Sequence, residues 1–169
     1  MAQGEEFTPG DALRSVEILY VDDESQRRDL MRRTLMSLGA RRVHVAESGA
    51  EGLKVVLGTT CGVVIVEHKM TPMDGIAFVR ELRSATNYPR ALVPALIVGE
   101  SASADVVRAA LAAGANNFLV KPIGAAKLYE RIGWAIGDAR PWVVHEGHYI
   151  IRPAKAVAPA GMVRAAAAK

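Results

Sequence analysis

The segment "VVIVEHKMTPMDG", residues 63–75, decides how the fold of this 169-residue chain is interpreted. It begins as a continuous apolar run, which is typical of a parallel strand covered on both faces. The run ends at a carboxylate, Glu67, and a loop that contains a proline leads on to Asp74 and Gly75. The sequence therefore raises one question first: why a charged side chain stands at the end of a buried strand.

Short apolar runs and helical repeats alternate on both sides of this segment. The expected strands are residues 16–21, 42–46, 62–66, 94–98 and 117–120, and the expected helices are residues 24–39, 48–58, 75–84, 103–114 and 125–139. Five strands that alternate with five helices predict an α/β fold. In such a fold a parallel sheet lies between layers of helices, and the crossovers are right-handed.

The alternating pattern covers residues 16–139, which we interpret as one domain with an N-terminal extension, 1–15, and a C-terminal tail, 140–169. Within the tail, "WVVHEGHYII" could form a small hairpin about Glu146-Gly147. A lone hairpin is only marginally stable, so this one would need the domain or a partner to lie against. The end of the tail is rich in Ala and Pro and is expected to be disordered.

The composition is that of a soluble globular protein, with half of the residues apolar and 23% charged. No apolar run approaches the roughly 20 residues needed to cross a bilayer, and the acidic start is unlike a signal peptide. The single cysteine, Cys61, cannot form an internal disulfide. We therefore expect a cytoplasmic protein without a membrane partner.

The formal net charge of +3 does not predict a nucleic-acid-binding surface. Residues 1–140 contain 17 basic and 17 acidic residues, so the excess lies in the tail. The one dense basic cluster is Arg27, Arg28, Arg32 and Arg33. At helical spacing these arginines are expected to form a solvated face, and a docking surface for an acidic partner is the alternative.

Ionisable residues follow three of the expected strands. They are Asp22 and Asp23 after the first strand, Glu67 after the third, and Lys121 after the fifth. Ligands of open parallel sheets bind beyond the carboxyl ends of the strands, so these side chains converge if the three strands lie close together. Three carboxylates and one amine suit a hard divalent cation such as Mg²⁺. The alternative is a structural network of ion pairs at the edge of the sheet.

Three motifs, in this order and at these separations, resemble the receiver domain of bacterial two-component response regulators. They are "VDDE" (21–24), "MTPMDG" (70–75) and "AALAAGANNFLVKP" (109–122). The resemblance extends from about Val16 to Asp138. It implies a flavodoxin-like (βα)5 doubly wound sheet with strand order 2-1-3-4-5.

The resemblance also implies a metal site. Asp23 would be a Mg²⁺ ligand, together with the acceptor carboxylate at Glu67 and the backbone carbonyl of Lys69. Asp22 would be a supporting carboxylate that holds the waters of the metal.

Other roles are implied on the fifth strand and after it. Lys121 would pair with the acceptor carboxylate or its phosphoryl group, and the bond between Lys121 and Pro122 would be cis, an isomer peculiar to proline. Phe118 takes the place of the aromatic residue that rotates on activation.

The sequence departs from the family pattern at two positions. Glu67 stands where the family has its phosphoryl-accepting aspartate, and Gly99 stands at the switch Ser or Thr. A displacement of about 1 Å can cost ~10²-fold in rate, and one extra methylene moves the carboxylate by at least that much. Glycine has no hydroxyl with which to bind a phosphoryl group, although Ser101 or Ser103 could substitute if the loop shifts.

These departures favour an atypical stand-alone receiver that is not an enzyme and that acts through protein contacts with little or no phosphorylation. Glu67 could reach Lys121 and imitate a phosphorylated state, or the pair could stabilise a static module. The alternative is a working receiver that accepts a phosphoryl group from a histidine kinase or phosphotransferase. An FMN-binding flavodoxin-like protein is disfavoured, because "DDESQ" after the first strand would repel phosphate.

The resemblance implies protein partners. The expected partners are a histidine kinase, a histidine phosphotransferase or a downstream signalling protein, and the expected output surface is residues 104–138, which could also mediate a homodimer. In the family, the first helix faces kinases and phosphotransferases.

Overall fold

The computed structural model describes residues 10–152, and the expected disorder at the end of the tail lies outside these residues. The strands are β1 (Glu17–Val21), β2 (Arg42–Ala46), β3 (Val63–Glu67), β4 (Ala95–Gly99), β5 (Asn117–Val120), β6 (Trp142–His145) and β7 (His148–Ile151). The α-helices are α1 (Ser25–Ser37), α2 (Gly49–Gly58), α3 (Gly75–Leu82), α4 (Ala104–Ala112) and α5 (Ala125–Ile136). Three short 3-10 helices are η1 (Asp11–Leu13), η2 (Ala85–Asn87) and η3 (Arg90–Leu92).

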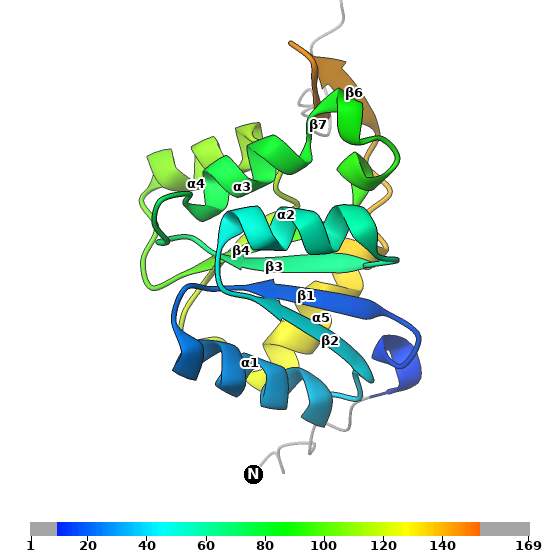
Figure 1. Ribbon diagram of the computed structural model, residues 1–169, viewed down its shortest axis with the longest axis vertical. Helices are drawn as coiled ribbons and strands as arrows, with labels where there is room; N and C mark the ends of the chain where they lie inside the picture. Colours follow the sequence, from blue (N-terminus) through cyan, green and yellow to red (C-terminus); the bar gives the residue numbers. More distant parts are fainter. Residues whose placement is uncertain (1–9, 153–169) are drawn as a thin grey trace, which may run out of the picture.

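The five predicted strands form one parallel sheet in the order β2-β1-β3-β4-β5, which confirms the predicted topology. Helices α1 and α5 cover one face of the sheet, and α2, α3 and α4 cover the other (Figure 1). Strands β1, β3 and β4 are buried along their whole length because they are central and are covered on both faces.

Side chains of the central strands alternate between two hydrophobic clusters. On β3, for example, Val64 and Val66 pack on the side of α2, α3 and α4, whereas Ile65 packs on the side of α1 and α5. Leu13 of the N-terminal extension is buried in this second cluster, so part of the extension belongs to the core. No helix within residues 10–152 has the length and apolar character needed to span a membrane.

The predicted hairpin is confirmed as β6 and β7, which pair antiparallel about Glu146 and Gly147. Both turn residues have positive φ angles, 48° and 78°, as a tight two-residue turn requires. The hairpin lies beyond the C-terminal end of α3 (Figure 1), where the backbone amide of Ala85 donates to the carbonyl of Gly147 at 2.8 Å. The domain thus supplies the surface that an isolated hairpin lacks.

A fully buried arginine, Arg83, joins the hairpin to the domain. Its guanidinium lies 4.5 Å from the ring centre of Trp142 on β6. Its hydrogen-bond acceptors are the carbonyls of Ala91, Val93 and Gly114 and the side-chain oxygen of Asn116. A buried charge is tolerated here because polar groups surround it on the domain side and an aromatic face covers it on the hairpin side.

Candidate functional site

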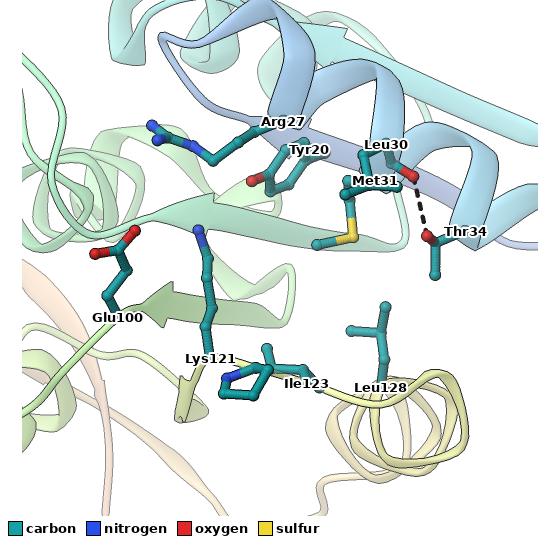
Figure 2. Close-up of a pocket in the computed structure, with 10 residues that line it drawn as sticks. Tyr20, Arg27, Leu30, Met31, Thr34, Glu100, Lys121, Ile123 and Leu128 are labelled. Atoms are coloured by element: carbon teal, nitrogen blue, oxygen red, sulfur yellow. Dashed lines mark hydrogen bonds between the residues drawn. The ribbon is translucent and has the colours of Figure 1, made fainter.

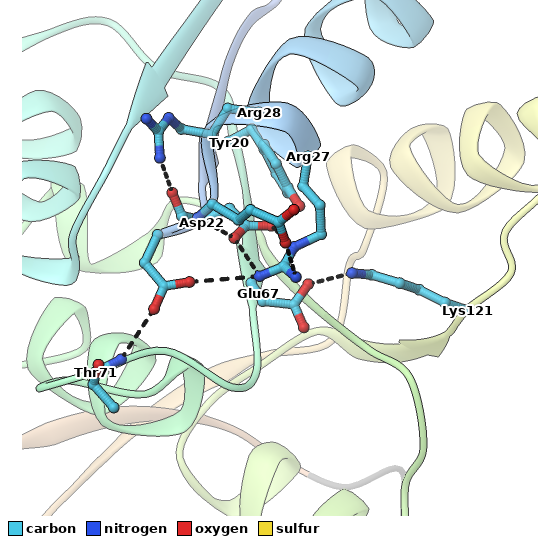
Figure 3. A network of polar contacts seen from close by, with 9 residues as sticks. Tyr20, Asp22, Arg27, Arg28, Glu67, Thr71 and Lys121 are labelled. Atoms are coloured by element: carbon cyan, nitrogen blue, oxygen red, sulfur yellow. Dashed lines mark hydrogen bonds and ion pairs between the residues drawn. The ribbon is translucent and has the colours of Figure 1, made fainter.

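Three carboxylates gather where β1 and β3 end, and we call Asp22, Asp23 and Glu67 the acidic pocket. Because β1 and β3 are neighbours in the sheet, their carboxyl ends meet at one edge. Asp22 and Glu67 are buried, with 0% and 3% of their surface exposed, whereas Asp23 is exposed. Figure 3 shows Asp22 and Glu67 converging with Lys121, as the sequence predicts.

Asp22 is saturated with hydrogen bonds. Its carboxylate accepts from the Tyr20 hydroxyl at 2.6 Å, from the Glu24 amide at 3.0 Å and from two Arg27 nitrogens at 2.8 Å each. Burial alone would raise the pKa of Asp22, but the hydrogen bonds from Arg27 and Tyr20 outweigh it and hold the pKa below its ordinary value. Burial and the bond to Asp22 raise the pKa of Tyr20, so its hydroxyl remains a donor.

Arg27 reaches into the acidic pocket from the first turn of α1. Besides its two bonds to Asp22, its guanidinium lies 3.5 Å from Asp23 Oδ1 and forms an ion pair with Glu24 (Figure 3). The hydrogen bond to Asp22 is the largest of the effects that raise the pKa of Arg27. The predicted solvated face is therefore wrong for Arg27, because three carboxylates beside the start of α1 attract its side chain inward.

The neighbouring arginine is also engaged at this edge, since Arg28 donates to the Asp22 carbonyl at 2.8 Å. A signal for the inward position of Arg27 exists in the sequence. A positive charge in the first turn of a helix opposes the helix dipole, and Arg27 stands four residues after Asp23. Both features indicate a carboxylate partner.

Lys121 lies directly after β5 and forms an ion pair with Glu67, with 2.5 Å between Nζ and Oε2. The Glu67 side chain is 4% exposed and the Lys121 side chain 23%. The bond between Lys121 and Pro122 is cis, as predicted. The loop after Glu67 approaches closely: a side chain at Gly75 would lie 2.6 Å from the Glu67 carbonyl oxygen, so only glycine fits there.

The predicted metal ligands are only partly brought together. Asp23 and Lys69 line one hollow of about 360 Å³, whereas Glu67 does not line it and is turned towards Lys121. The second Asp23 oxygen lies 3.4 Å from the Thr71 amide. Within residues 10–152, no three His, Cys, Asp or Glu side chains are arranged to hold a metal ion.

Gly99, the predicted switch position, ends β4 beside the Phe118 ring. A Cβ atom at Gly99 would lie 3.1 Å from Phe118 Cζ and 3.2 Å from His68 Cβ, so these two side chains fill the space of the missing one. Phe118 is 8% exposed, and its ring meets the His68 ring edge to face at 5.5 Å. The aromatic residue therefore lies inside the protein.

His68, which directly follows β3, does not lie in solvent. It is half-buried, and its Nδ1 atom is buried without a hydrogen-bond partner. The cause is the vacancy at Gly99 on the neighbouring strand, which leaves room for the imidazole beside Phe118. Ser103, considered as a substitute switch residue, caps α4 by accepting from the Val106 amide at 3.2 Å.

An apolar groove of about 510 Å³ lies beside the acidic pocket, between α1 and α5 (Figure 2). Its lining residues are Tyr20, Arg27, Leu30, Met31, Thr34, Glu100, Lys121, Pro122, Ile123 and Leu128. Leu30 is 61% exposed although it lies on the same helix as the buried Leu35. This groove was not predicted from the sequence, where the available signal is an apolar residue, Leu30, among the arginines of α1.

A family profile and the similar sequences named below all belong to receiver-domain proteins. The sequence profile described as "Response regulator receiver domain" matches residues 18–133. The chemotaxis protein CheY1 of Helicobacter pylori is 32% identical over 72% of this chain and 98% of that protein. The probable chemotaxis protein CheY of Rhizobium etli is 30% identical over 72% of this chain and 93% of that protein.

Solved structures agree with the sequence relatives. Chemotaxis protein CheY4 of Vibrio cholerae matches with a TM-score of 0.65 and 28% identity, covering 71% of this chain and 98% of that one. The receiver domain of a Pseudomonas aeruginosa sensor histidine kinase, which coordinates a magnesium ion in its active-site cleft, matches with a TM-score of 0.66 and 25% identity, covering 74% and 100%. Because the receiver profile matches residues 18–133 and the sheet order is that of the matched structures, this chain belongs to the response regulator receiver family.

Proposed function

We propose that this receiver domain transmits its signal through protein contacts and is not switched by phosphorylation. One observation carries the proposal: the carboxylate at the acceptor position, Glu67, is buried and already paired with Lys121. In a working receiver the acceptor oxygen must be open to a phosphoryl donor in line with the bond that breaks. Here Lys121 holds one of the two Glu67 oxygens, Oε2, and the extra methylene of glutamate displaces the carboxylate from the position that an aspartate would have.

The second support comes from the switch residues. Gly99 offers no hydroxyl to a phosphoryl group, and Phe118 is already buried against His68. A phosphoryl group on Glu67 would therefore find no hydroxyl donor at position 99. It would also find no exposed aromatic side chain that could move inward, because Phe118 is already inside. We infer a single conformational state in which Phe118 stays inside.

The Glu67–Lys121 pair partly imitates the bond between a phosphorylated acceptor and its lysine. The imitation is incomplete, because a carboxylate has one negative charge and a phosphoryl group nearly two. A buried Phe118 favours an active-like state over a static module without output. The proposed output surface is that of α4, β5 and α5, where Leu111, Val120 and Trp134 are exposed.

The partners that we propose are those of the family: a histidine kinase, a histidine phosphotransferase or a downstream signalling protein. A homodimer through the same output surface would use the same exposed side chains. The polar surface of α1 with Arg32 and Arg33 remains available for an acidic partner, since both residues are exposed.

Phosphoryl acceptance is the rival function, and the retention of Lys121 and of the acidic pair at Asp22 and Asp23 favours it. The test is incubation with acetyl phosphate and Mg²⁺, followed by intact-mass spectrometry and an assay for acid-labile phosphate. We expect no phosphate on the wild type. Phosphate that is present on the wild type, absent from Glu67→Gln and retained by the surface control Glu130→Gln would contradict the proposal.

A further inference from the structure

We infer that Arg27 is a built-in cation that occupies the acidic pocket in place of a divalent metal ion, and that it keeps Mg²⁺ from binding there. The inference concerns metal binding alone and does not depend on the proposed function. Asp22, Asp23 and Glu67 fit a divalent ion by residue type, but their observed contacts do not fit one while Arg27 is present.

The first argument is the geometry of the guanidinium. Nε and Nη2 of Arg27 each lie 2.8 Å from a different oxygen of Asp22, which is the bidentate arrangement that arginine forms with carboxylates. The same Nη2 is 3.5 Å from Asp23, and Nη1 forms an ion pair with Glu24. One guanidinium therefore contacts three carboxylates and neutralises part of their charge.

The second argument is the availability of oxygen ligands. Mg²⁺ requires near-octahedral oxygen ligands at about 2.0–2.1 Å, including one or two carboxylates. Both Asp22 oxygens accept from Arg27 and from a second donor, Tyr20 or Glu24. Glu67 Oε2 is held by Lys121. A metal ion bound through Asp22 or Glu67 Oε2 would have to break these charge-assisted contacts. A metal ion bound at Asp23 would meet the positive charge of Arg27, which lies 3.5 Å from Asp23 Oδ1.

The third argument is charge balance. The acidic pocket has three carboxylates, and the two cations Arg27 and Lys121 contact them. Without Arg27 the group would have a net charge of about −2, which a divalent ion matches. With Arg27 present that match is lost. The arginine is also tethered to α1, so it binds without the entropy cost of recruiting a free ion.

The test compares the wild type with Arg27→Met, which keeps a long side chain and removes the charge, and with the control Arg32→Met. Arg32 is exposed on the same helix and makes none of the pocket contacts described above. Binding of Mg²⁺ is measured by calorimetry, and binding of Mn²⁺ by the loss of free-ion paramagnetic resonance. Thermal unfolding with and without Mg²⁺ gives an independent readout.

We expect one saturable site in Arg27→Met, with affinity about tenfold or more above that of the wild type. Its unfolding temperature should rise with Mg²⁺, whereas those of the wild type and Arg32→Met should not. Adding Asp23→Asn to Arg27→Met should remove the new site. If Arg27→Met does not fold, Arg27→Gln replaces it.

Two outcomes would overturn the inference. One is a wild type whose unfolding temperature rises with Mg²⁺, a measurement that needs no variant. The other is a folded Arg27→Met or Arg27→Gln that gains no affinity, which would make Arg27 an ordinary structural ion-pair partner. Either outcome is distinct from phosphorylation of the wild type, which tests the proposed function.

Discussion

The substitution Gly99→Thr tests whether the missing side chain at the end of β4 allows Phe118 to stay inside. A Cβ atom there would lie 3.1 Å from Phe118 Cζ and 3.2 Å from His68 Cβ, and threonine adds two more heavy atoms. Overpacking of this kind costs about 1–3 kcal/mol, and replacing a strand glycine returns about 0.5–1 kcal/mol. The difference between the middle values of these two ranges is a net loss of about 1 kcal/mol in the free energy of unfolding.

Urea unfolding measures this loss, and NMR contacts between the Phe118 and His68 rings report whether the aromatic ring has moved outward. Phe118→Leu removes the far end of the ring, so Gly99→Thr should cost less in that background, with a coupling of about 1 kcal/mol. The control Gly133→Ala adds a methyl group in α5 where, apart from the backbone of the helix itself and the adjacent residues, no atom lies within 4 Å, and it should stabilise by about 0.5–1 kcal/mol. A Gly99→Thr protein as stable as the wild type, with unchanged ring contacts, would refute the reasoning.

Three further predictions concern ion pairs and the hairpin. Glu67→Gln should lower the free energy of unfolding by about 1–2 kcal/mol, less than for a fully buried pair because Lys121 is 23% exposed; an unchanged urea midpoint would argue against a stabilising pair. Arg83→Met leaves buried carbonyls without a donor, so it should lower the free energy of unfolding by about 3 kcal/mol or more. In a Trp134→Phe background it should also shift the fluorescence emission of Trp142 to the red, and an unshifted emission would show that the hairpin stays in place. The hydrogen bond from Arg140 lowers the pKa of Asp138 from 3.8 to about 2, so the stability from this group is present above pH 4 and is lost as the pH falls towards 2. In Asp138→Asn the acid-induced loss measured over that range should shrink by about 2 kcal/mol, and an identical pH profile would contradict the assignment.

The fold was predictable because its signals are local. Each apolar run is short and is followed by a helical repeat. The positions at which the period of the pattern changes lie within a few residues of the observed ends of the strands and helices. At the site, two strands extend one residue further than predicted: β3 includes Glu67, which is paired with Val98, and β4 includes Gly99, which is paired with Val120. The positions of Glu67 and Lys121 followed from the order of the strands.

The position of Arg27 could not be predicted from helical spacing alone. Spacing indicates which face of a helix a residue occupies, but a long side chain in the first turn can bend towards charges beyond the helix end. Its target, Asp22, is five residues earlier in the chain, in the loop between β1 and α1. The helix dipole and the spacing to Asp23 indicate a carboxylate partner, but which carboxylate it is depends on how the strand and the helix meet.

The half-buried position of His68 could not be predicted from the sequence for a related reason. A residue that follows a strand is usually in a solvated loop, and only the vacancy at Gly99 on a neighbouring strand gives the imidazole a place inside. The two residues are 31 positions apart in sequence and meet only because β3 and β4 are paired. Identifying this contact requires the register of the sheet as well as its order.

Strand alternation also separates the two departures of this chain from the family pattern. Val98, which is paired with Glu67, belongs to the cluster under α1 and α5, whereas Phe118 belongs to the cluster under α3 and α4. Because successive side chains point to opposite faces, the Glu67–Lys121 pair and the contact of Gly99 with Phe118 lie on opposite sides of the sheet. Each can therefore change without repacking the other. Under the proposed function, Glu67→Asp alone would restore the phosphoryl-accepting carboxylate but not the hydroxyl that responds to it. Gly99→Thr alone would restore the hydroxyl but not the accepting carboxylate.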